Sequence, residues 1–445
     1  MIPGQRAERE RPPGPRAARR NTDETAIPPG RGEEATNVIT VSQTVRDLVD
    51  QAAESTRPLA EARALPPACY TSEEFFAFER EAIFAHTWLC LGHQNQVPNP
   101  GDYFAITLID EPLLVVRDQE GQIRVLSAVC QHRGHPIATG QGNCKQFRCP
   151  YHWWSYALSG ELVAAPEMDK TVPIADLRRE IRLPALKVEL WQGFIFANFD
   201  PDATPLAPSL VKLSDEMANY EMERMVVMPE TDIPDLRWNW KITHENALEP
   251  YHTQFVHKGY HEMAPASTAT FLDWDPDDGQ IMHPTYFREI DGGLNPTGKA
   301  MFPIIRGLTE EQRRRTVFAS VPPTMFLSLK PDQVFTFLVL PQSVGTLTLR
   351  INFYFPEETV KQRNFQWTYQ SQLACTKIFG EQDGATNANL QRGLRSRFAP
   401  RGRYCHQEAT LPQFSRWLVK RYRQYLGLEP AVAASGVATN GRSTP

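Results

Sequence analysis

The sequence contains no run of 18 apolar residues, about the length that a helix needs to cross a bilayer, so no membrane-spanning helix is predicted. It also lacks a basic excess, because the formal net charge is −5, which gives no electrostatic support for nucleic-acid binding. The seven cysteines are an odd number scattered along the chain and do not form a disulfide framework. What remains is a chain of 445 residues, 41% of them hydrophobic, which is enough for a large core and two domains.

The first 40 residues contain few large apolar side chains and many Arg, Pro, Glu and Gly residues. Burial in such a segment cannot offset the entropy cost of ordering it, so residues 1–40 are predicted to be disordered. No apolar segment follows Arg19 and Arg20, and acids such as Glu8 and Glu33 are not expected in a transit peptide. We therefore expect a cytoplasmic protein, with a second flexible segment at residues 426–445.

Two helices are predicted in residues 41–86. Apolar residues at helical spacing in residues 41–53 indicate a short amphipathic helix. Ser72 is a candidate N-cap for a second helix over residues 72–86, and two acids follow it in the favourable first turn. We expect both helices to brace the domain that follows them in the sequence.

From residue 87 the pattern changes to short β-type runs separated by turn signals. These runs are residues 103–108, 113–117, 123–128 and 188–199. Several prolines at residues 200–208 break both helix and strand patterns and mark the end of this part. An all-β domain over residues 87–200 is therefore predicted.

The second half of the chain contains further strand-like runs, at residues 324–329, 334–340 and 346–355. They predict a large antiparallel sheet with helices around it, in a second domain over residues 201–425, and such a sheet could enclose an apolar pocket. The predicted fold class is thus α+β, an all-β domain followed by a domain in which helices cover an antiparallel sheet.

Two thiols and two imidazoles in the first domain have the spacing of a metal-binding set. They lie in the pattern Cys130-Gln-His132 and, further on, Cys149-Pro-Tyr-His152. These ligand types suit a zinc ion, or a [2Fe-2S] cluster in which two histidines replace two cysteines on one iron. The flanks, C-Q-H-R-G-H and C-P-Y-H-W-W, resemble the cluster-binding loops of Rieske proteins and favour the iron–sulfur interpretation. His135 is then a spare histidine of the first loop.

A second group of metal-ligand residue types lies in residues 239–257. It contains Glu249, His252 and His257. On a helix, Glu249 and His252 would share a face, because residues three apart are neighbours. His252 and His257 are five residues apart, and on a helix their side chains would be rotated by about 140° from one another. Both rings can reach one metal only if the helix ends or distorts between them; the alternative is a pair of surface histidines on an ordinary helix.

Residues 75–425 resemble the large (alpha) subunit of a Rieske non-heme iron oxygenase, in the ring-hydroxylating oxygenase superfamily. The shared motifs are the two loops above, the run N-W-K…E-N-x-x-E-x-Y-H-x-x-x-x-H that starts at Asn239, and a late E-x-D…Q run from Glu381 to Gln391. The E-N-x-x-E-x-Y-H spacing and the segment 323–332 are similar to the branch of glycine betaine, carnitine and choline oxygenases. The resemblance implies a Rieske [2Fe-2S] cluster, a mononuclear Fe(2+) and O2 as co-substrate.

The resemblance also implies ligands for both metal centres. The cluster ligands would be Cys130, His132, Cys149 and His152, and the iron ligands would be His252, His257 and Asp383. Two imidazoles and one carboxylate on one face of the iron leave positions for oxygen and substrate. For the carboxylate, two other interpretations remain open. Glu381 could be the ligand, or both acids could lie on a solvated helix face.

Glu249 receives a catalytic role from the resemblance. In relatives, an acid three residues before the first iron histidine connects that histidine to the second cluster histidine of a neighbouring subunit. The same role is implied for Glu249 between His252 and His152, although many relatives have Asp, which is one methylene shorter. The alternative is an ordinary helix acid with no part in electron transfer. A bridge between subunits requires a ring of subunits, most simply a homotrimer.

Other residues near these motifs have weaker implications. Asn246 and Tyr251 are expected to order water or ligands near the iron, and packing would explain Tyr251 equally well. His244 and His261 are expected to be exposed or hydrogen-bonded rather than catalytic. The aromatic residues expected in the sheet core, where some could line the pocket, are Phe326, Phe335, Phe337, Tyr354 and Phe355.

The sequence contains no G-x-G-x-x-G dinucleotide motif, so a separate NAD(P)H-dependent reductase of the flavin/iron–sulfur type, with or without a ferredoxin, is expected to supply electrons. The leading hypothesis is a terminal monooxygenase that hydroxylates or oxidatively demethylates a small organic substrate, in its most specific form a quaternary or tertiary amine. The second is an aromatic-ring dioxygenase or a natural-product oxygenase. The third is a non-enzymatic Rieske electron carrier, against which the intact His252, His257 and Asp383 set argues.

Overall fold

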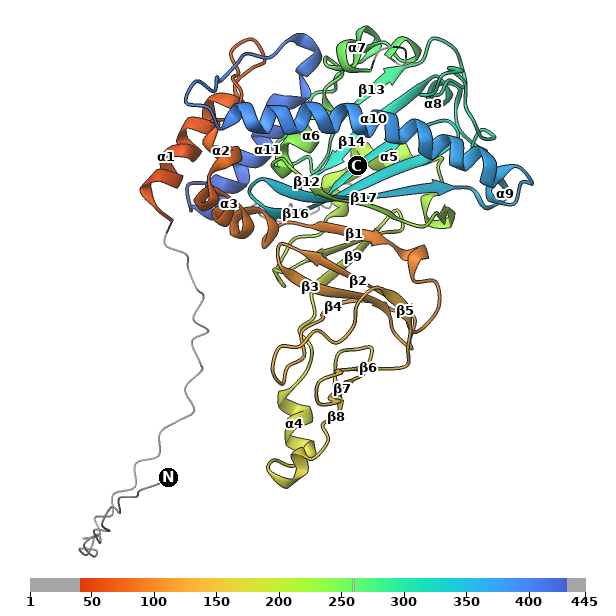
Figure 1. The fold of residues 1–445 in the computed structure, drawn as a ribbon. Coiled ribbons are helices and arrows are strands. Elements are labelled where there is room, and N and C mark those ends of the chain that lie inside the picture. Colours follow the sequence, from red (N-terminus) through yellow and green to blue (C-terminus); the bar gives the residue numbers. More distant parts are fainter. Residues whose placement is uncertain (1–40, 258, 260, 430–445) are drawn as a thin grey trace, which may run out of the picture. The chain divides into compact units, whose positions relative to one another are not determined.

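The computed structural model describes residues 41–257, 259 and 261–429 (Figure 1). The predicted disordered segment 1–40 and residues 430–445 of the predicted flexible segment lie outside the described residues. Every helix within the described ranges is too short or too polar to cross a bilayer. All seven cysteines are free thiols, as the absence of a disulfide pattern predicts.

The chain begins with the two predicted helical segments. The helices are α1 (Gln43–Ala52), α2 (Ala68–Thr71) and α3 (Glu73–Glu79), and a π-helical turn (Arg80–Phe84) continues α3. The predicted cap is confirmed, because the Ser72 hydroxyl accepts a hydrogen bond from Phe75 N at 3.2 Å. Ser42 caps α1 in the same way, through Val45 N.

The second helical segment contacts the domain next in the sequence, as expected, because Arg80 pairs with Asp110 and donates to Ile109 O. These helices also brace the C-terminal part of the chain, which was not expected. Glu79 forms a fully buried ion pair with Lys241, with an Nζ–Oε1 distance of 2.8 Å. Tyr422, on α11 (Thr410–Tyr425), donates to the same carboxylate, and its ring centroid is 5.4 Å from that of Phe75. A buried ion pair needs hydrogen bonds to its remaining polar atoms. The partners of the Glu79 carboxylate that provide them come from distant parts of the sequence.

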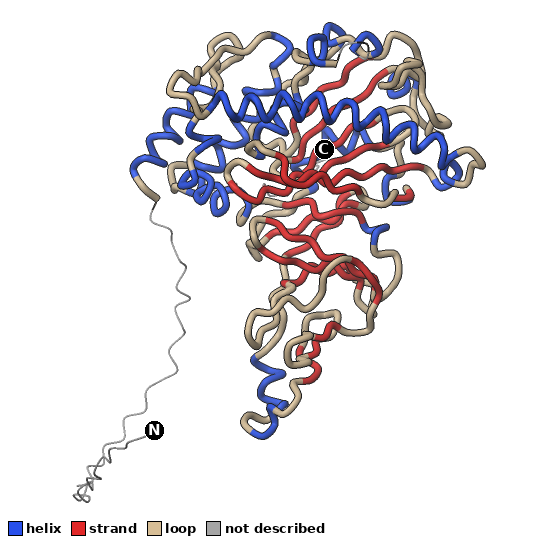
Figure 2. Tube along the Cα trace, viewed as in Figure 1, coloured by secondary structure: helices blue, strands red, loops and turns tan. Residues whose placement is uncertain are grey.

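Three small antiparallel sheets follow (Figure 2). Their hydrogen-bonding orders are β1-β10-β9, β4-β3-β2-β5 and β6-β7-β8. The strands are β1 (Leu89–His93), β2 (Asp102–Leu108), β3 (Glu111–Arg117), β4 (Ile123–Ser127), β5 (Gln141–Asn143), β6 (Phe147–Arg148), β7 (Ser155–Tyr156), β8 (Leu162–Ala164), β9 (Lys187–Trp191) and β10 (Phe194–Asn198). The predicted β-type runs are confirmed as strands, and residues 188–199 form the β9–β10 hairpin. One helix, α4 (Ile174–Glu180), lies between β8 and β9.

A seven-stranded antiparallel sheet forms the second half of the described chain. Its order is β11-β17-β16-β15-β14-β13, and β12 also pairs with β17. The strands are β11 (Val226–Val227), β12 (Thr231–Leu236), β13 (Ile281–Tyr286), β14 (Arg315–Val321), β15 (Met325–Leu329), β16 (Val334–Ser343) and β17 (Thr346–Phe355). The helices are α5 (Val211–Met217), α6 (Trp240–Leu248), α7 (Thr253–Val256), α8 (Glu310–Arg313), α9 (Glu357–Val360) and α10 (Phe365–Leu394). The three strand-like runs predicted here are β15, β16 and β17.

The two faces of this sheet have different roles. Val317 and Ala319 on β14, and Leu327 on β15, are buried in the main core. Alternate residues point to the opposite face, because side chains alternate along a strand. Phe318 and Phe326 therefore lie on the side where the long helix α10 crosses the sheet, and both line the cavity described below (Figure 1).

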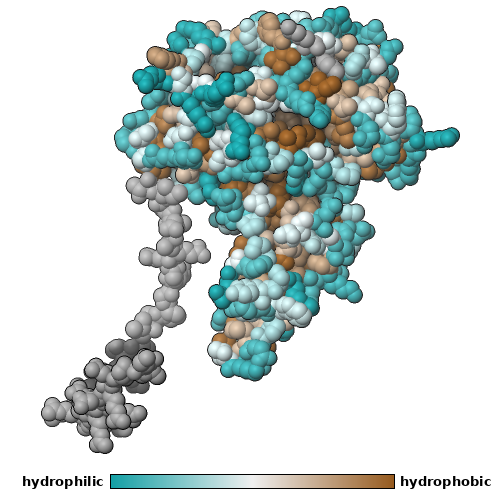
Figure 3. Space-filling model, in the orientation of Figure 1, coloured by the Kyte–Doolittle hydropathy of each residue, from teal (hydrophilic) through white to brown (hydrophobic). Residues whose placement is uncertain are grey.

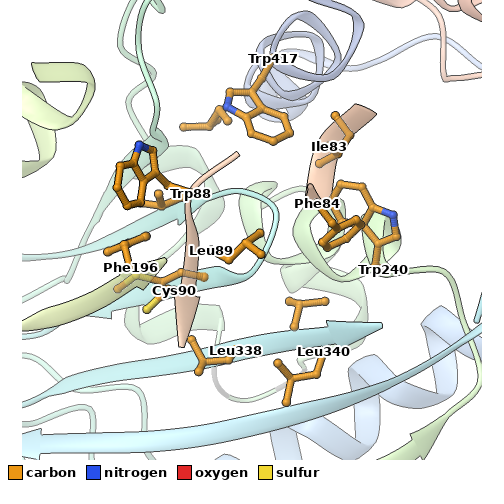
Figure 4. Close-up of a cluster of buried hydrophobic side chains, with 14 of the residues drawn as sticks. Ile83, Phe84, Trp88, Leu89, Cys90, Phe196, Trp240, Leu338, Leu340 and Trp417 are labelled. Carbon is orange, nitrogen blue, oxygen red and sulfur yellow. The ribbon is translucent and has the colours of Figure 1, made fainter. Parts of the chain in front are cut away.

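One core joins the first set of sheets to the large sheet (Figure 4). Cys90 of β1 and Leu338 of β16 belong to it, and Cys90 N donates to Thr324 Oγ1 at 2.7 Å. The loops that carry the predicted cluster ligands have a separate small core, which includes Trp154 and Tyr156. These loops therefore extend from a scaffold that is packed firmly against the large sheet.

Candidate active site

The two predicted cluster loops are tight turns on the β scaffold. The first follows β4, and in it Cys130 N donates to His135 O at 3.0 Å. The second joins β6 to β7, and in it Cys149 N donates to Trp154 O at 2.8 Å. His135, the spare histidine, turns its own Nδ1 to a backbone carbonyl, Pro136 O, at 2.6 Å. Backbone hydrogen bonds thus fix both loops and bring their ligand side chains together.

The side chains of these loops fit the ligand set of a Rieske cluster. Cys130 and Cys149 are buried, and the ring centroids of His132 and His152 are 4.7 Å apart. The buried Nδ1 of His152 has no hydrogen-bond partner among the described residues. Burial raises the pKa of the Cys130 thiol, so that a bound metal would be needed to keep this sulfur deprotonated. The Trp154 ring stacks on His132 at 4.6 Å and fixes its orientation.

Tyr156 contacts the predicted ligands, although the sequence motifs do not include it. Its hydroxyl lies 3.3 Å from Cys130 Sγ and accepts a hydrogen bond from Gln131 N at 3.1 Å. Hydrogen bonds to ligating sulfurs tune the reduction potential of an iron–sulfur cluster. The only signal in the sequence is a tyrosine four residues after His152, on the strand that closes the second loop.

The second loop exposes aromatic side chains on its outer surface. Tyr151 and Trp153 flank His152 and are 51% and 60% exposed. The guanidinium of Arg133 lies 5.4 Å from the Tyr151 ring centroid, and that of Arg148 lies 5.1 Å from the Trp153 ring centroid. The edge of the cluster site that carries His152 is therefore surrounded by exposed rings and cations.

The second predicted site lies where the helical run over residues 239–257 is broken. α6 ends at Leu248, Glu249 is extended (φ −117°, ψ 128°), and α7 is a single turn between His252 and His257. Glu249 and His252 therefore do not lie on one helix, and the condition for a shared helix face is not met. Pro250 explains the break, because the residue before a proline is disfavoured in the helical region. α7 ends at Val256, so the helix does end between His252 and His257, as the metal-binding interpretation requires.

The broken backbone brings three ligand-type atoms together. Nε2 of His252 and Nε2 of His257 are 3.3 Å apart, and Oδ1 of Asp383 on α10 lies 3.5 and 3.1 Å from them. All three atoms lie within 4.8 Å of one another. The Asp383 Oδ1 atom is buried and accepts no hydrogen bond from the described residues. This arrangement fits two imidazoles and one carboxylate that face a single metal ion.

In both histidine rings, Nδ1 is hydrogen-bonded, which leaves Nε2 free to bind a metal. Nδ1 of His252 donates to Glu249 Oε1 at 2.6 Å, and Nδ1 of His257 donates to Gln382 Oε1 at 2.8 Å. Each bond keeps the proton on Nδ1 and leaves the lone pair of Nε2 directed at Asp383. Burial alone would lower the pKa of His252, but the bond and charge of Glu249 and the charge of Asp383 raise it above its ordinary value.

The structure separates the two acids of the late motif. Asp383 contacts both histidines, whereas Glu381 is exposed and lies 3.7 Å from Lys377 Nζ. Gln391, the last residue of that motif, is buried away from the histidines. Its Oε1 accepts from Asn239 N at 2.9 Å, and its Nε2 donates to a backbone carbonyl of α2. Gln391 thus ties α10 to the start of α6.

A cavity of about 870 Å³ extends from this group along the space between α10 and the sheet. Its volume lies in the range of about 300–1,000 Å³ that is typical of small-molecule sites. The aromatic residues that line it are Phe318, Phe326, Phe335, Phe337, Phe353 and Phe379. Apolar side chains gather around a hollow beside α10 on the face drawn in Figure 3. Tyr354 is instead buried in the main core, and Phe355 is buried against Phe302 and Phe365.

The weaker candidates of the motif have different surroundings. Asn246 and His261 line the cavity. Tyr251 is exposed, does not line the cavity and contacts the exposed ring of Phe255, which agrees with the packing alternative. His244 is fully buried, and its ring nitrogens contact the Ser320 hydroxyl at 2.7 Å and a backbone carbonyl at 2.8 Å. It is a hydrogen-bonded core histidine, as expected.

Glu249 and His152 do not meet within one chain. Both carboxylate oxygens of Glu249 contact His252, through Nδ1 and through the backbone N–H at 3.0 Å. His152 contacts the rings of His132 and Tyr151. Among the described residues, no hydrogen bond or ring contact joins Glu249 to His152.

Two protein-family models match the chain. Residues 87–184 match the Rieske [2Fe-2S] domain, and residues 217–424 match the catalytic domain of the ring hydroxylating alpha subunit. The first range contains the cysteine–histidine loops, and the second contains His252, His257 and Asp383. The predicted fold class, an all-β cluster domain followed by helices on an antiparallel sheet, is confirmed.

Relatives of known activity include monooxygenases and dioxygenases. The carnitine monooxygenase oxygenase subunit of Acinetobacter pittii is 27% identical over 342 residues, which are 75% of this chain and 85% of the relative. The chlorobenzene dioxygenase subunit alpha of Cupriavidus sp. is 35% identical over 220 residues, 47% of this chain and 46% of the relative. The crystal structure of the quaternary ammonium Rieske monooxygenase CntA is similar with a TM-score of 0.71 at 22% identity, over 84% of this chain and 98% of that chain.

Proposed function

Because this chain belongs to the Rieske non-heme iron oxygenases, as a large (alpha) subunit, we propose that it is a terminal oxygenase that hydroxylates or oxidatively demethylates a small organic substrate. In this proposal, a separate NAD(P)H-dependent reductase supplies the electrons, and O2 is the co-substrate. Residues 87–200 form the domain that accepts electrons, and residues 201–425 form the domain that binds the substrate.

The observation that carries the proposal is the meeting of His252, His257 and Asp383 at the cavity wall. These three side chains would bind Fe(2+), and Cys130, His132, Cys149 and His152 would bind the cluster. When bound, the iron supplies the position at which O2 is activated beside the substrate. Glu249 and Gln382 hold the protons on the far ring nitrogens, and the apolar cavity wall excludes water and orients the substrate.

Electron transfer in this proposal crosses from one subunit to the next. Glu249 of one subunit, which already holds His252, would bridge to His152 of a neighbouring subunit and carry the electron path from the cluster to the iron without itself being reduced. The exposed rings beside each group support a contact there. Tyr151 and Trp153 flank His152, and Phe255 lies close to Glu249 in the sequence. Exposed aromatic residues are enriched at protein interfaces, and a head-to-tail contact that closes gives a ring, most simply a homotrimer.

A single-turnover measurement tests the proposal. The cluster-loaded protein is reduced without oxygen and mixed with O2 and a panel of trimethylammonium compounds and aromatic acids, while cluster absorbance and formaldehyde are followed. We expect a substrate to accelerate cluster reoxidation in the natural protein. His257→Ala should slow that reoxidation about 10-fold or more, because it removes an iron ligand while the cluster colour persists. Undiminished turnover in this variant would show that the iron site lies elsewhere.

Aromatic-ring dioxygenation is the second candidate function. The phenylalanine-lined cavity and the similarity to chlorobenzene dioxygenase subunit alpha favour it. Labelled O2 separates the two reactions, because a dioxygenase transfers both oxygen atoms to the ring and a monooxygenase transfers one. The third hypothesis, a non-enzymatic electron carrier, gives no reason for an intact His252, His257 and Asp383 group beside a cavity.

A further inference from the structure

A buried lysine lies in the wall of the substrate cavity. Lys330 directly follows β15, and its side chain is on the same side of that strand as Phe326 and Ser328, because residues two apart share a face. All three residues line the cavity. Lys330 is only 9% exposed, which is unusual for an ammonium group that has no ion pair.

Lys330 has no ion pair within the described chain, although the charge of the buried Asp332 acts on it from further away. No carboxylate oxygen of the described residues lies within 4.0 Å of its Nζ. Its neighbour Asp332 turns one carboxylate oxygen to the backbone N–H groups of Met301 and Phe302, at 2.8 and 3.2 Å. The contact that Lys330 does make is with the Phe335 ring, whose centroid is 5.8 Å from Nζ. A buried cation without an anion costs free energy, which a bound anion would offset.

The other charged groups of the cavity do not leave a free anion for Lys330. The carboxylates of Glu249 and Asp383 contact the two histidines, and Glu381 lies beside Lys377. Asp235 is exposed. Lys330 is therefore a buried cation of this cavity that has no carboxylate in direct contact.

Lys330 lies at a distance from the proposed iron ligands. The charge of Lys330 acts on Cys375 of α10. Gln333, three residues after Lys330, also contacts α10, because its Nε2 donates to Gln372 Oε1 at 3.0 Å. Cys375 precedes Asp383 by eight residues, which corresponds to about 12 Å along a helix. Six phenylalanine side chains are among the residues that line this cavity.

We propose that the substrate is a hydrophobic carboxylic acid whose carboxylate pairs with Lys330, while its apolar body lies against the phenylalanine wall and reaches the His252, His257 and Asp383 group. This inference rests on the proposed oxygenase function and names the substrate class of that same cavity. Lys330 would repel a simple cation, and an uncharged aromatic hydrocarbon would leave Lys330 unpaired, so neither class of ligand fits the cavity as well as an acid does.

Burial lowers the pKa of Lys330, and the nearby Asp332 opposes that shift. A carboxylate that enters the cavity would raise the same pKa again, because it favours the charged form of the amine. The ammonium and the carboxylate thus stabilise each other away from water.

Isothermal titration calorimetry on the full-length, metal-loaded protein tests the proposal without any turnover. The probes are the phenylalkanoates from phenylacetate to phenylhexanoate, each compared with its primary amide and with the trimethylammonium compound of equal length. We expect at least one acid to bind more tightly than its amide and its ammonium analogue. In Lys330→Met that acid should bind about 30-fold or more weakly, as is typical when one partner of a buried charge pair is removed.

Two further variants separate a lost charge from a damaged fold. Lys361→Met removes a lysine that is 69% exposed and does not line the cavity, and acid binding should stay as in the natural protein. Lys330→Arg retains the positive charge and should recover much of the preference for acids. The proposal is wrong if no acid binds more tightly than its amide, or if Lys330→Met binds the acids as well as the natural protein does. Failure of the oxygenase function would appear separately, as a reduced cluster that O2 and substrate do not reoxidise.

Discussion

At the proposed iron site, the amide of Gln382 determines which nitrogen of His257 is free. Its Oε1 accepts from Nδ1 at 2.8 Å, so Nε2 faces Asp383 at 3.1 Å. The sequence motif E-x-D contains Gln382 only as the unspecified residue. Its role follows from a contact across 125 residues, which local spacing does not encode.

Gln382→Leu removes this acceptor and keeps most of the side-chain volume. We expect iron affinity to fall about 10- to 100-fold, because an unheld imidazole loses its orientation and part of its basicity. Iron bound per chain, measured after dialysis against a graded series of chelator concentrations, reports the change. Glu381→Gln, on the exposed neighbour of the same helix, is the control and should retain iron normally. Equal iron retention in both variants would remove Gln382 from the site.

The residue types and their spacing predicted the cysteine and histidine groups, because such metal-ligand sets recur at fixed intervals along a chain. Asp383 was implied only by the family resemblance, with Glu381 left open as the ligand, and the structure brings Asp383 to the histidines. Tyr156 and Lys330 could not be predicted in this way. A tyrosine on a strand and a lysine in a turn are ordinary residues until burial and neighbours are known.

Among the elements, α10 connects several parts of the proposed site. It supplies Asp383 and Gln382 to the histidines, and it forms one wall of the cavity. Its position relative to α6 depends on Gln391, which accepts from Asn239 N and donates to Tyr70 O at 3.0 Å. A buried amide that bridges two backbone groups leaves both without a partner when it is removed.

Gln391→Leu should therefore destabilise the protein by about 1–3 kcal/mol, the usual cost of unpaired buried polar groups. The midpoint of urea unfolding should fall, while the slope of the unfolding free energy against urea concentration stays unchanged. Asn389→Leu changes an exposed residue two positions earlier on α10 and should leave the midpoint nearly unchanged. If both variants unfold at the same urea concentration as the natural protein, Gln391 does not fix α10.

The elements themselves were predictable where the pattern is local. The capped helix after Ser72, the strands of the first domain and the runs that became β15 to β17 follow from periodicity and turn residues. The contact of the N-terminal helices with the C-terminal part of the chain was not predictable, since the Glu79–Lys241 pair joins residues 162 positions apart. Metal binding required a break between His252 and His257, and α7 ends at Val256, between them. Pro250 explains the earlier end of α6.

At the scale of the whole molecule, the two proposed metal centres need more than one chain. Glu249 and His152 make no contact with each other in the described chain, and each lies near exposed aromatic residues. The proposal therefore requires the cluster of one subunit to serve the iron of its neighbour. Neither metal centre alone would support turnover.

Mixed oligomers test this claim most directly. His152→Ala removes a cluster ligand, His257→Ala removes an iron ligand, and each protein alone should be inactive in single turnover. Chains of both kinds, co-expressed with different tags and purified through both, would contain pairs in which an intact cluster faces the intact iron site of a neighbour. The account predicts that substrate-dependent cluster reoxidation returns in these oligomers. If they assemble with the expected iron content and remain as inactive as either parent, the electron path between subunits is contradicted.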